Sequence, residues 1–274
     1  MKRRIALGIS PCPNDTFAFH ALLSRSIPTP ELELEFTLAD VEELNRRFLA
    51  GEFDASKLSF AALAGRRGLR VLSAGSALGF GVGPVLLAAP GRRAERGADG
   101  RPRLAREARV LCPGAHTTAT LLYRSFHPGE GRVEQRVFSE ILPELARGAA
   151  DFGVCIHEGR FTYAAHGLEL VEDLGARWEE RERAPLPLGG IVAREALGTQ
   201  VLAALEDALG RSIDAARADP ASALATMRRH AQEHDDAVLW KHVELYVNAW
   251  TRELGPEGRR AIERFLALAA AQSP

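Results

Sequence analysis

The stretch 150–163, ADFGVCIHEGRFTY, ends an apolar run on two titratable residues, His157 and Glu158. An unperturbed imidazole titrates at about pH 6.5, so His157 can accept a proton at neutral pH without a large change in its environment. We therefore take His157 as the candidate general base, and a solvent-facing histidine at a strand end is the simpler alternative. Because adjacent strand residues point to opposite faces, Glu158 orients the ring only if the loop breaks that alternation.

Two further segments suit the binding of a negatively charged group. In PGAHTTA (113–119), Thr117 and Thr118 lie at a helix N-terminus, where free N–H groups and the helix dipole attract a carboxylate or phosphate. Helix capping alone is the simpler role for these threonines. At a strand end, Lys57 can neutralise a substrate carboxylate and Ser59 can donate a hydrogen bond, unless the two are an ordinary surface pair.

Metal and nucleotide cofactors are not indicated. Cys12, Cys112 and Cys155 are far apart and show no metal-ligand spacing, and small buried hydrophobic residues are a better interpretation of them than a thiol nucleophile. The run HEGRF lacks the second histidine of the zinc-protease motif, and no glycine-rich phosphate fingerprint follows the first strand. We expect no metal and no cofactor.

The composition is that of a globular protein with neither nucleic-acid nor membrane partners. The 274 residues carry a net charge of −1, with 46% hydrophobic and 26% charged residues. The Arg-rich stretch 92–109 alternates in sign and indicates a solvated linker or insertion rather than a binding face. The apolar run before Pro11 is too short for a signal peptide, and no stretch approaches the ~18 apolar residues of a membrane span. We expect a cytoplasmic location.

The order of strands and helices repeats in two parts of the chain. The first part predicts strands over 4–9, 31–38 and 54–60 and helices over 16–25 and 40–51. The second part predicts strands at ARVLC, RVEQRVF and DFGVCIH, and helices that begin at a Thr cap near 117 and at Ser139. Both parts close on a helix that ends near a Gly, followed by an Asp that opens a short strand. This predicts two lobes of similar α/β topology.

The apolar runs 81–89 and 187–194 are expected to be the hinge crossings between the lobes. The first lobe would comprise 1–86 and 192–274, with the C-terminal helices, and the second 87–191. Ligands of open α/β sheets bind at the carboxyl ends of strands. The polar segments expected there are Ser10–Asp15, Lys57–Ser59, Pro113–Thr118 and His157–Glu158. Asn14 and Asp15 are candidate caps or contacts, and a cleft between the lobes is expected.

Seven segments resemble the 1,4-dihydroxy-6-naphthoate synthase family of the futalosine route of menaquinone biosynthesis. They are SPCPNDTFAFHAL (10–22), DVEELNR (40–46), KLSFAA (57–62), GFGVGPVL (79–86), PGAHTTA (113–119), IHEGRFTY (156–163) and LPLGGIVAR (186–194). The resemblance covers essentially the whole chain up to the helix expected over 241–250, except 92–108. It implies a two-lobed fold similar to type 2 periplasmic binding proteins.

The same resemblance implies a lyase that converts cyclic de-hypoxanthine futalosine, a small substrate carrying a carboxylate, to 1,4-dihydroxy-6-naphthoate and dihydroxyacetone. It implies that His157 is the proton acceptor. It implies substrate contacts at Lys57, Leu58 and Ser59 and at Thr118 and Ala119, with the adjacent Thr117 retained because the register within HTTAT is open. Asn14 completes the set of candidate contacts.

Three other functions stay open at this point. A small organic-anion binding protein would share the fold, but it would usually need an export signal or lipid anchor. The chorismate dehydratase of the same pathway resembles this chain in fold, and the run HEGRFTY favours the naphthoate synthase over it. A ligand sensor would need a DNA-binding or output segment. Fold alone does not separate these functions, because function depends on the site.

Overall fold

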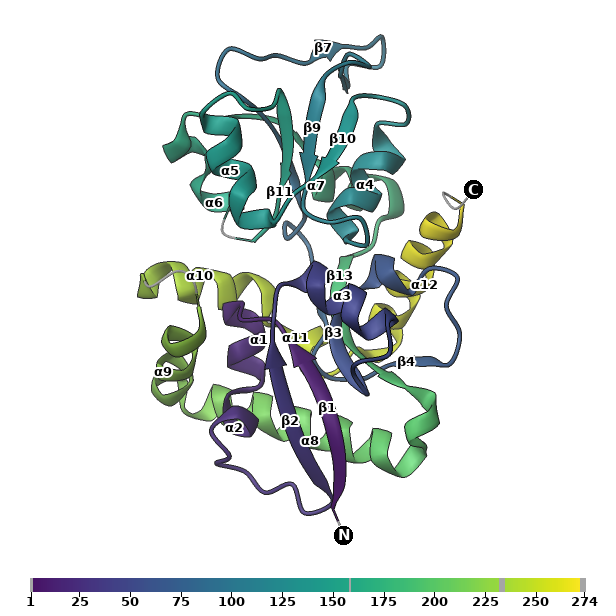
Figure 1. Cartoon of the computed structure of the whole chain (residues 1–274), viewed down its shortest axis with the longest axis vertical. Coiled ribbons are helices and arrows are strands. Elements are labelled where there is room, and N and C mark those ends of the chain that lie inside the picture. The colour runs from purple at the N-terminus through teal and green to yellow at the C-terminus, as the bar shows by residue number, and fades with distance from the viewer. Residues whose placement is uncertain (1, 158, 232–234, 272–274) are drawn as a thin grey trace. The chain divides into compact units, whose positions relative to one another are not determined.

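The computed structural model describes residues 2–157, 159–231 and 235–271 (Figure 1). The chain forms two compact units: unit 1 comprises Met1–Gly79 and Pro187–Leu266, and unit 2 comprises Phe80–Leu186 and Ala267–Pro274. Among the residues that are described, none of the helices has the length and apolar character needed to span a bilayer.

Unit 1 is built on a mixed β-sheet with helices on both faces. Its strands are β1 (Arg3–Ile9), β2 (Leu32–Leu38), β3 (Ala55–Ser59), β4 (Leu69–Val71), β5 (Ala77–Gly79) and β13 (Leu186–Arg194). Its helices are α1 (Pro13–Ala18), α2 (His20–Leu23), α3 (Val41–Leu49), η1 (Phe60–Leu63), η3 (Glu195–Leu197), α8 (Thr199–Ala218), α9 (Pro220–His230), α10 (Asp236–Tyr246), α11 (Ala249–Arg252) and most of α12 (Gly255–Ala270). The described strands run in the order β2-β1-β3-β13-β4, and β5 pairs with β13.

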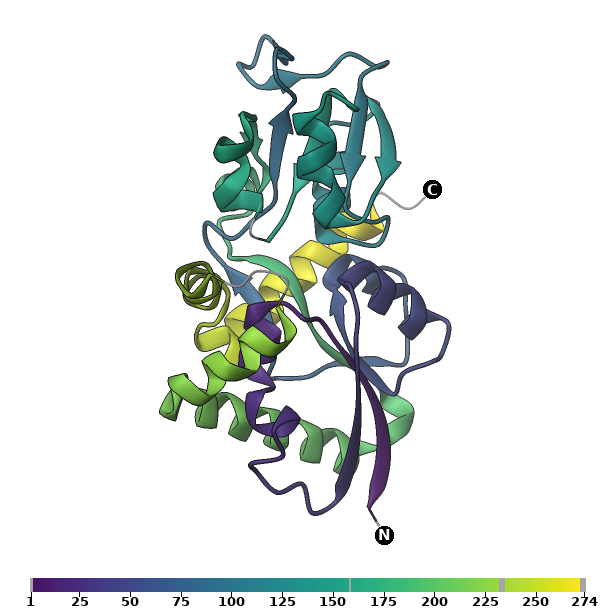
Figure 2. The same cartoon turned by 60° about the vertical axis from the view of Figure 1, so that its left-hand side comes forward.

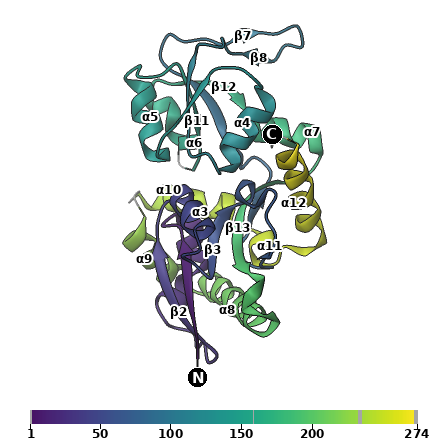
Figure 3. The same ribbon diagram turned by 45° about the vertical axis from the view of Figure 1, so that its right-hand side comes forward.

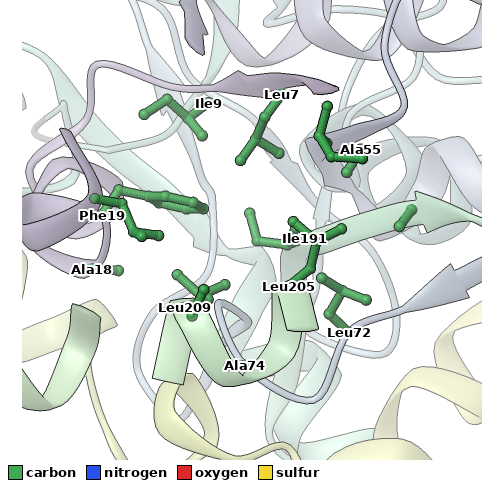
Figure 4. Close-up of a cluster of buried hydrophobic side chains, with 14 of the residues drawn as sticks. Leu7, Ile9, Ala18, Phe19, Ala55, Leu72, Ala74, Ile191, Leu205 and Leu209 are labelled. Atoms are coloured by element: carbon green, nitrogen blue, oxygen red, sulfur yellow. The ribbon is translucent and has the colours of Figure 1, made fainter. Parts of the chain in front are cut away.

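The core of unit 1 lies between the sheet and α8 (Figures 2 and 4). Alternate residues of β1, among them Leu7, are buried against side chains that include Leu209 of α8. Gly8 points to the opposite face, where an added Cβ would lie 2.8 Å from Leu44 Cδ2 of α3. The period of two along β1 therefore places α8 on one face of the sheet and α3 on the other.

Unit 2 repeats this design. Its strands are β6 (Val85–Ala88), β7 (Glu95–Arg96), β8 (Pro102–Arg103), β9 (Arg109–Cys112), β10 (Arg132–Gln135), β11 (Phe152–Cys155) and β12 (Glu169–Asp173). Its helices are α4 (Thr118–Phe126), α5 (Phe138–Ala146), α6 (Gly159–Thr162), η2 (Tyr163–His166) and α7 (Leu174–Glu182). Figure 3 shows α5 and α6 on one side of β11, and α4 and α7 on the other. Gly153 of β11 lets α5 approach, because a Cβ there would lie 2.7 Å from Leu145 Cδ1.

The two sheets have the same topology. In unit 1, β2, β1 and β3 are mutually parallel, and β13 and then β4 follow with antiparallel pairing. In unit 2, β10, β9 and β11 are parallel, and β6 and then β12 follow with antiparallel pairing. The repetition of elements that the sequence predicted is confirmed, and it places the carboxyl ends of three parallel strands at one edge of each sheet.

The chain passes between units at 79/80, 186/187 and 266/267. The first two positions lie earlier than the 86/87 and 191/192 that the sequence predicted, and the third assigns 267–274, which the sequence placed in the first lobe, to unit 2. The reason is strand pairing. All of β6 pairs with β11 and so belongs to unit 2, whereas β13 pairs with β3 and β4 and so belongs to unit 1. Within the stretch 92–108, β7 and β8 form a two-stranded hairpin.

Two helix starts differ from the sequence predictions. Cys12 occupies the N-cap of α1 and Pro13 its first position, so Asp15 lies inside the first turn rather than at the cap. Proline is favoured at that position because its missing N–H would have had no helical acceptor. Val137, not Ser139, precedes α5. The cap expected at Thr117 is present, and Asp40 caps α3 at the predicted start of the helix over 40–51.

Truncation of Leu145 to Ala should lower the free energy of unfolding of unit 2 by about 2–5 kcal/mol, because it leaves a cavity between α5 and β11. Leu170→Ala is the matched control, since that side chain is 48% exposed on β12, and should cost less than about 1 kcal/mol. Urea denaturation measures both. Equal losses in the two variants would contradict the packing described for α5.

Candidate active site

Unit 1 has a buried ion pair at the carboxyl ends of β1 and β3. Asp15 Oδ1 and Lys57 Nζ lie 2.6 Å apart, with 3% and 8% of their side chains exposed. Asp15 also accepts hydrogen bonds from Ser10 Oγ at 2.7 Å and Asn14 Nδ2 at 2.9 Å. The Lys57 ammonium donates a further bond to the Gly75 carbonyl at 3.3 Å. These bonds offset part of the cost of desolvating two charges.

The other predicted contacts of β3 are also buried, so the alternative of an ordinary surface Lys–Ser pair is wrong. Leu58 is fully buried, backbone and side chain together. The Ser59 N–H donates to Oδ1 of the fully buried Asn45 at 3.0 Å. The end of β3 is thus fixed by α3 on one side and by the ion pair of Asp15 on the other.

A histidine that the sequence analysis did not select reaches the same network. His242 of α10 lies with its Nε2 2.9 Å from Asn14 Oδ1, and both residues are buried. Because Asn14 Nδ2 donates to Asp15, the amide oxygen is the atom that accepts from His242. In the sequence His242 occupies an apolar position of a helix, so periodicity alone predicts only packing for it.

In unit 2, hydrogen bonds to the carbonyl and N–H groups of Gly114 hold the turn between β9 and α4. The Gly114 carbonyl accepts hydrogen bonds from Thr117 Oγ1 at 2.8 Å and Thr120 Oγ1 at 2.6 Å. The Gly114 N–H donates to Gln135 Oε1 at 2.9 Å, and Gly114 has a φ of +121°, which favours glycine. Thr117 also caps α4 by accepting from the Thr120 N–H at 3.2 Å.

The start of α4 has the features of an anion site. The first N–H groups of any α-helix have no acceptor inside the helix, and the helix dipole favours negative charge there. Thr118 and Ala119, two of the predicted contacts, form the first turn of α4 and are buried. Among the described residues, two buried side-chain atoms have no hydrogen-bond partner, and these are Gln135 Nε2 and Ser76 Oγ.

His157 follows β11 and has a backbone conformation that residues other than glycine rarely adopt. Its φ is +55°, in the left-handed region, where residues other than glycine carry a backbone cost. Its ring packs edge-on against Phe138, the first residue of α5, with centroids 4.9 Å apart. The strand β11 lies beside β9 in parallel register, so His157 and the turn at Gly114 extend from adjacent carboxyl ends. Glu158 lies outside the described residues.

Cys112 and Cys155 do not offer an accessible thiolate. Burial raises the pKa of the Cys112 thiol to about 12, against the opposing effect of a hydrogen bond with Thr120. Burial also raises the pKa of Cys155. Both side chains are packed in the sheet of unit 2, as expected for small hydrophobic residues. Among the residues described here, no group of three His, Cys, Asp or Glu side chains is arranged to hold a metal ion.

Two curated relatives cover nearly the whole chain. The 1,4-dihydroxy-6-naphtoate synthase of Thermus thermophilus is 47% identical over 269 residues, which are 98% of this chain and 94% of the relative. The enzyme of the same name from Streptomyces coelicolor is 39% identical over 275 residues, with 98% and 93% covered. The profile of the family described as menaquinone biosynthesis matches residues 5–271.

Solved structures give the fold class. Protein AF1704 from Archaeoglobus fulgidus superposes with a TM-score of 0.88 at 29% identity, over 98% of this chain and 97% of that one. The alkanesulfonate-binding protein SsuA of Xanthomonas axonopodis pv. citri, bound to MOPS, superposes with a TM-score of 0.70 at 13% identity, over 100% and 96%. The chain therefore has the α/β fold of periplasmic binding proteins, as predicted.

Within that fold class, the chain belongs to the menaquinone biosynthesis family, among the 1,4-dihydroxy-6-naphthoate synthases. The resemblance noted in the sequence is confirmed, and so is the expectation of an enzyme.

Asp15→Asn should lower the free energy of unfolding by about 3–5 kcal/mol, because it leaves the buried Lys57 ammonium without its carboxylate. Asp207→Asn breaks the exposed pair with Arg211 on α8 of the same unit and should cost less than about 1 kcal/mol. Urea denaturation at neutral pH measures the loss of free energy of unfolding in both variants. A smaller loss for Asp15→Asn than for Asp207→Asn would show that the buried pair is not a structural requirement.

Proposed function

We propose that this enzyme converts cyclic de-hypoxanthine futalosine to 1,4-dihydroxy-6-naphthoate with release of dihydroxyacetone, as a lyase of menaquinone biosynthesis. The observation that supports the proposal is the parallel pairing of β11 and β9, because the segments that lead to His157 and to the turn before α4 extend from these adjacent strand ends of one unit. A base and an anion-binding helix start in that relation suit a substrate with both a carboxylate and an acidic C–H bond.

His157 is the general base in this proposal. It removes a proton from the sugar-derived part of the substrate, next to its carbonyl group. The resulting enolate drives the cleavage that releases dihydroxyacetone, and formation of the aromatic naphthoate makes the step irreversible. The left-handed backbone at His157 and the contact with Phe138 support this role, because both fix the direction of the imidazole.

The remaining candidate residues bind substrate in the same proposal. Thr117, Thr118 and Ala119 present the start of α4 to the substrate carboxylate. Asn14, Lys57, Leu58 and Ser59 supply further contacts. Lys57 is held in place by Asp15, so it acts as a fixed donor rather than as a mobile counter-ion.

We also place the reaction in the cytoplasm. The three cysteines are free, which fits a reducing compartment.

The variant His157→Asn should lower turnover at least about 10²-fold, since a positioned general base contributes about 10²–10⁴-fold. Asparagine tolerates the left-handed region, so the backbone at 157 is retained. His166→Asn is the matched control, because it removes an exposed imidazole of the same unit and should leave turnover unchanged. Purified protein is incubated with the futalosine-derived substrate, and dihydroxynaphthoate is quantified by mass spectrometry.

Near-full activity of a folded His157→Asn would refute the role of this residue. Tight binding of the substrate without product in the wild type would instead favour a small organic-anion binding protein, the activity that the name of SsuA describes. Turnover of chorismate in place of the futalosine derivative would favour a chorismate dehydratase.

A further inference from the structure

Gln135, the last residue of β10, has an amide group with two different surroundings. Its Oε1 accepts the hydrogen bond from the Gly114 N–H at 2.9 Å. A backbone N–H can only donate, so the oxygen of the amide must face Gly114 and the NH2 group must face elsewhere. The orientation of the side chain is thus fixed by the turn before α4.

The NH2 group of Gln135 is a buried donor without an acceptor in the part of the chain that the structure describes. Its Nε2 is buried and has no hydrogen-bond partner among the described residues. Folded proteins satisfy nearly all buried polar atoms, because a buried donor without an acceptor is destabilising. A buried donor without an acceptor in a candidate site is explained if a ligand atom accepts its hydrogen bond.

The position of Gln135 connects it to both parts of the candidate site in unit 2. It pairs in register with Cys112, two residues before Gly114, at the carboxyl ends of β10 and β9. Three residues after it, Phe138 contacts the ring of His157. The amide therefore lies at the strand edge that carries the candidate base and the start of α4.

We propose that Gln135 is a substrate-binding residue whose Nε2 donates a hydrogen bond to an oxygen of the substrate bound at the turn 113–119. The inference deepens the proposed function and rests on it. The oxygen acts as the acceptor, and among the acceptors that complete an NH2 group a carboxylate oxygen forms the strongest hydrogen bond. By the same contact, Gln135 couples substrate binding to the Gly114 peptide that positions Thr117.

A purely structural role for Gln135 would require only its Oε1, and one substitution separates the two roles. Gln135→Glu keeps an oxygen for the Gly114 N–H, removes the donor and adds a negative charge. Gln200→Glu on α8 is the matched control, because it makes the same change at an exposed glutamine.

The measurements are KM and kcat with the futalosine-derived substrate and the Kd of the product, 1,4-dihydroxy-6-naphthoate. For Gln135→Glu we expect KM and Kd to rise about 10–100-fold, the range lost with a hydrogen bond to a charged group, and kcat to change little. Gln200→Glu should match the wild type. If Gln135→Glu does not fold, Gln135→Met removes both the donor and Oε1 without adding charge and should raise KM in the same direction.

Unchanged KM and Kd in folded Gln135→Glu, with an active wild type, would overturn this inference and leave the proposed function standing. A wild type that neither turns over the substrate nor binds the product would overturn the proposed function and, with it, this inference.

Discussion

The parallel pairing of β9 with β11 is the constraint on which the candidate chemistry of unit 2 depends. It brings the segment that ends in His157 next to the turn at Gly114, although about 40 residues of chain separate them. β10 joins the same edge by parallel pairing with β9, and it supplies Gln135 and the approach to Phe138. Lateral hydrogen bonds between strands, rather than any local motif, thus gather the candidate base His157, its packing partner Phe138 and the start of α4.

Unit 1 has the same topology as unit 2, but different side chains lie at the carboxyl ends of its strands. Where unit 2 presents an imidazole and a helix start, unit 1 encloses a charged pair whose carboxylate is already bonded to Ser10, Asn14 and Lys57. A pair that is desolvated on both sides is costly to assemble and strongly destabilising to break. It is therefore suited to hold β3 and α1 in a fixed relation, which keeps the backbone of Leu58 and the hydroxyl of Ser59 in place.

Much of this arrangement could be predicted from the sequence, and the rest could not for identifiable reasons. The apolar runs of β1 and β11 and the cap at Thr117 are local signals, and they predicted the repeated α/β order. The segment with His157 was found because an apolar strand ends abruptly on a titratable residue.

The contacts between distant parts of the chain could not be predicted. Asp15 is 42 residues from its partner Lys57, and His242 is 228 residues from its partner Asn14, so no local pattern indicates either contact. Asp15 was expected to cap a helix because its residue type favours that role, whereas α1 begins two residues earlier, at Pro13. The left-handed backbone conformation of His157 could not be predicted either, because histidine as a residue type does not indicate it.

The central claim is that an imidazole at position 157 supplies the base, and chemical rescue tests it most directly. In His157→Gly, the glycine adopts a φ of +55° without cost and leaves space for a free imidazole. The account predicts that this variant is inactive alone and that added imidazole restores turnover in proportion to its neutral form. Full turnover by His157→Gly without added imidazole would contradict the account.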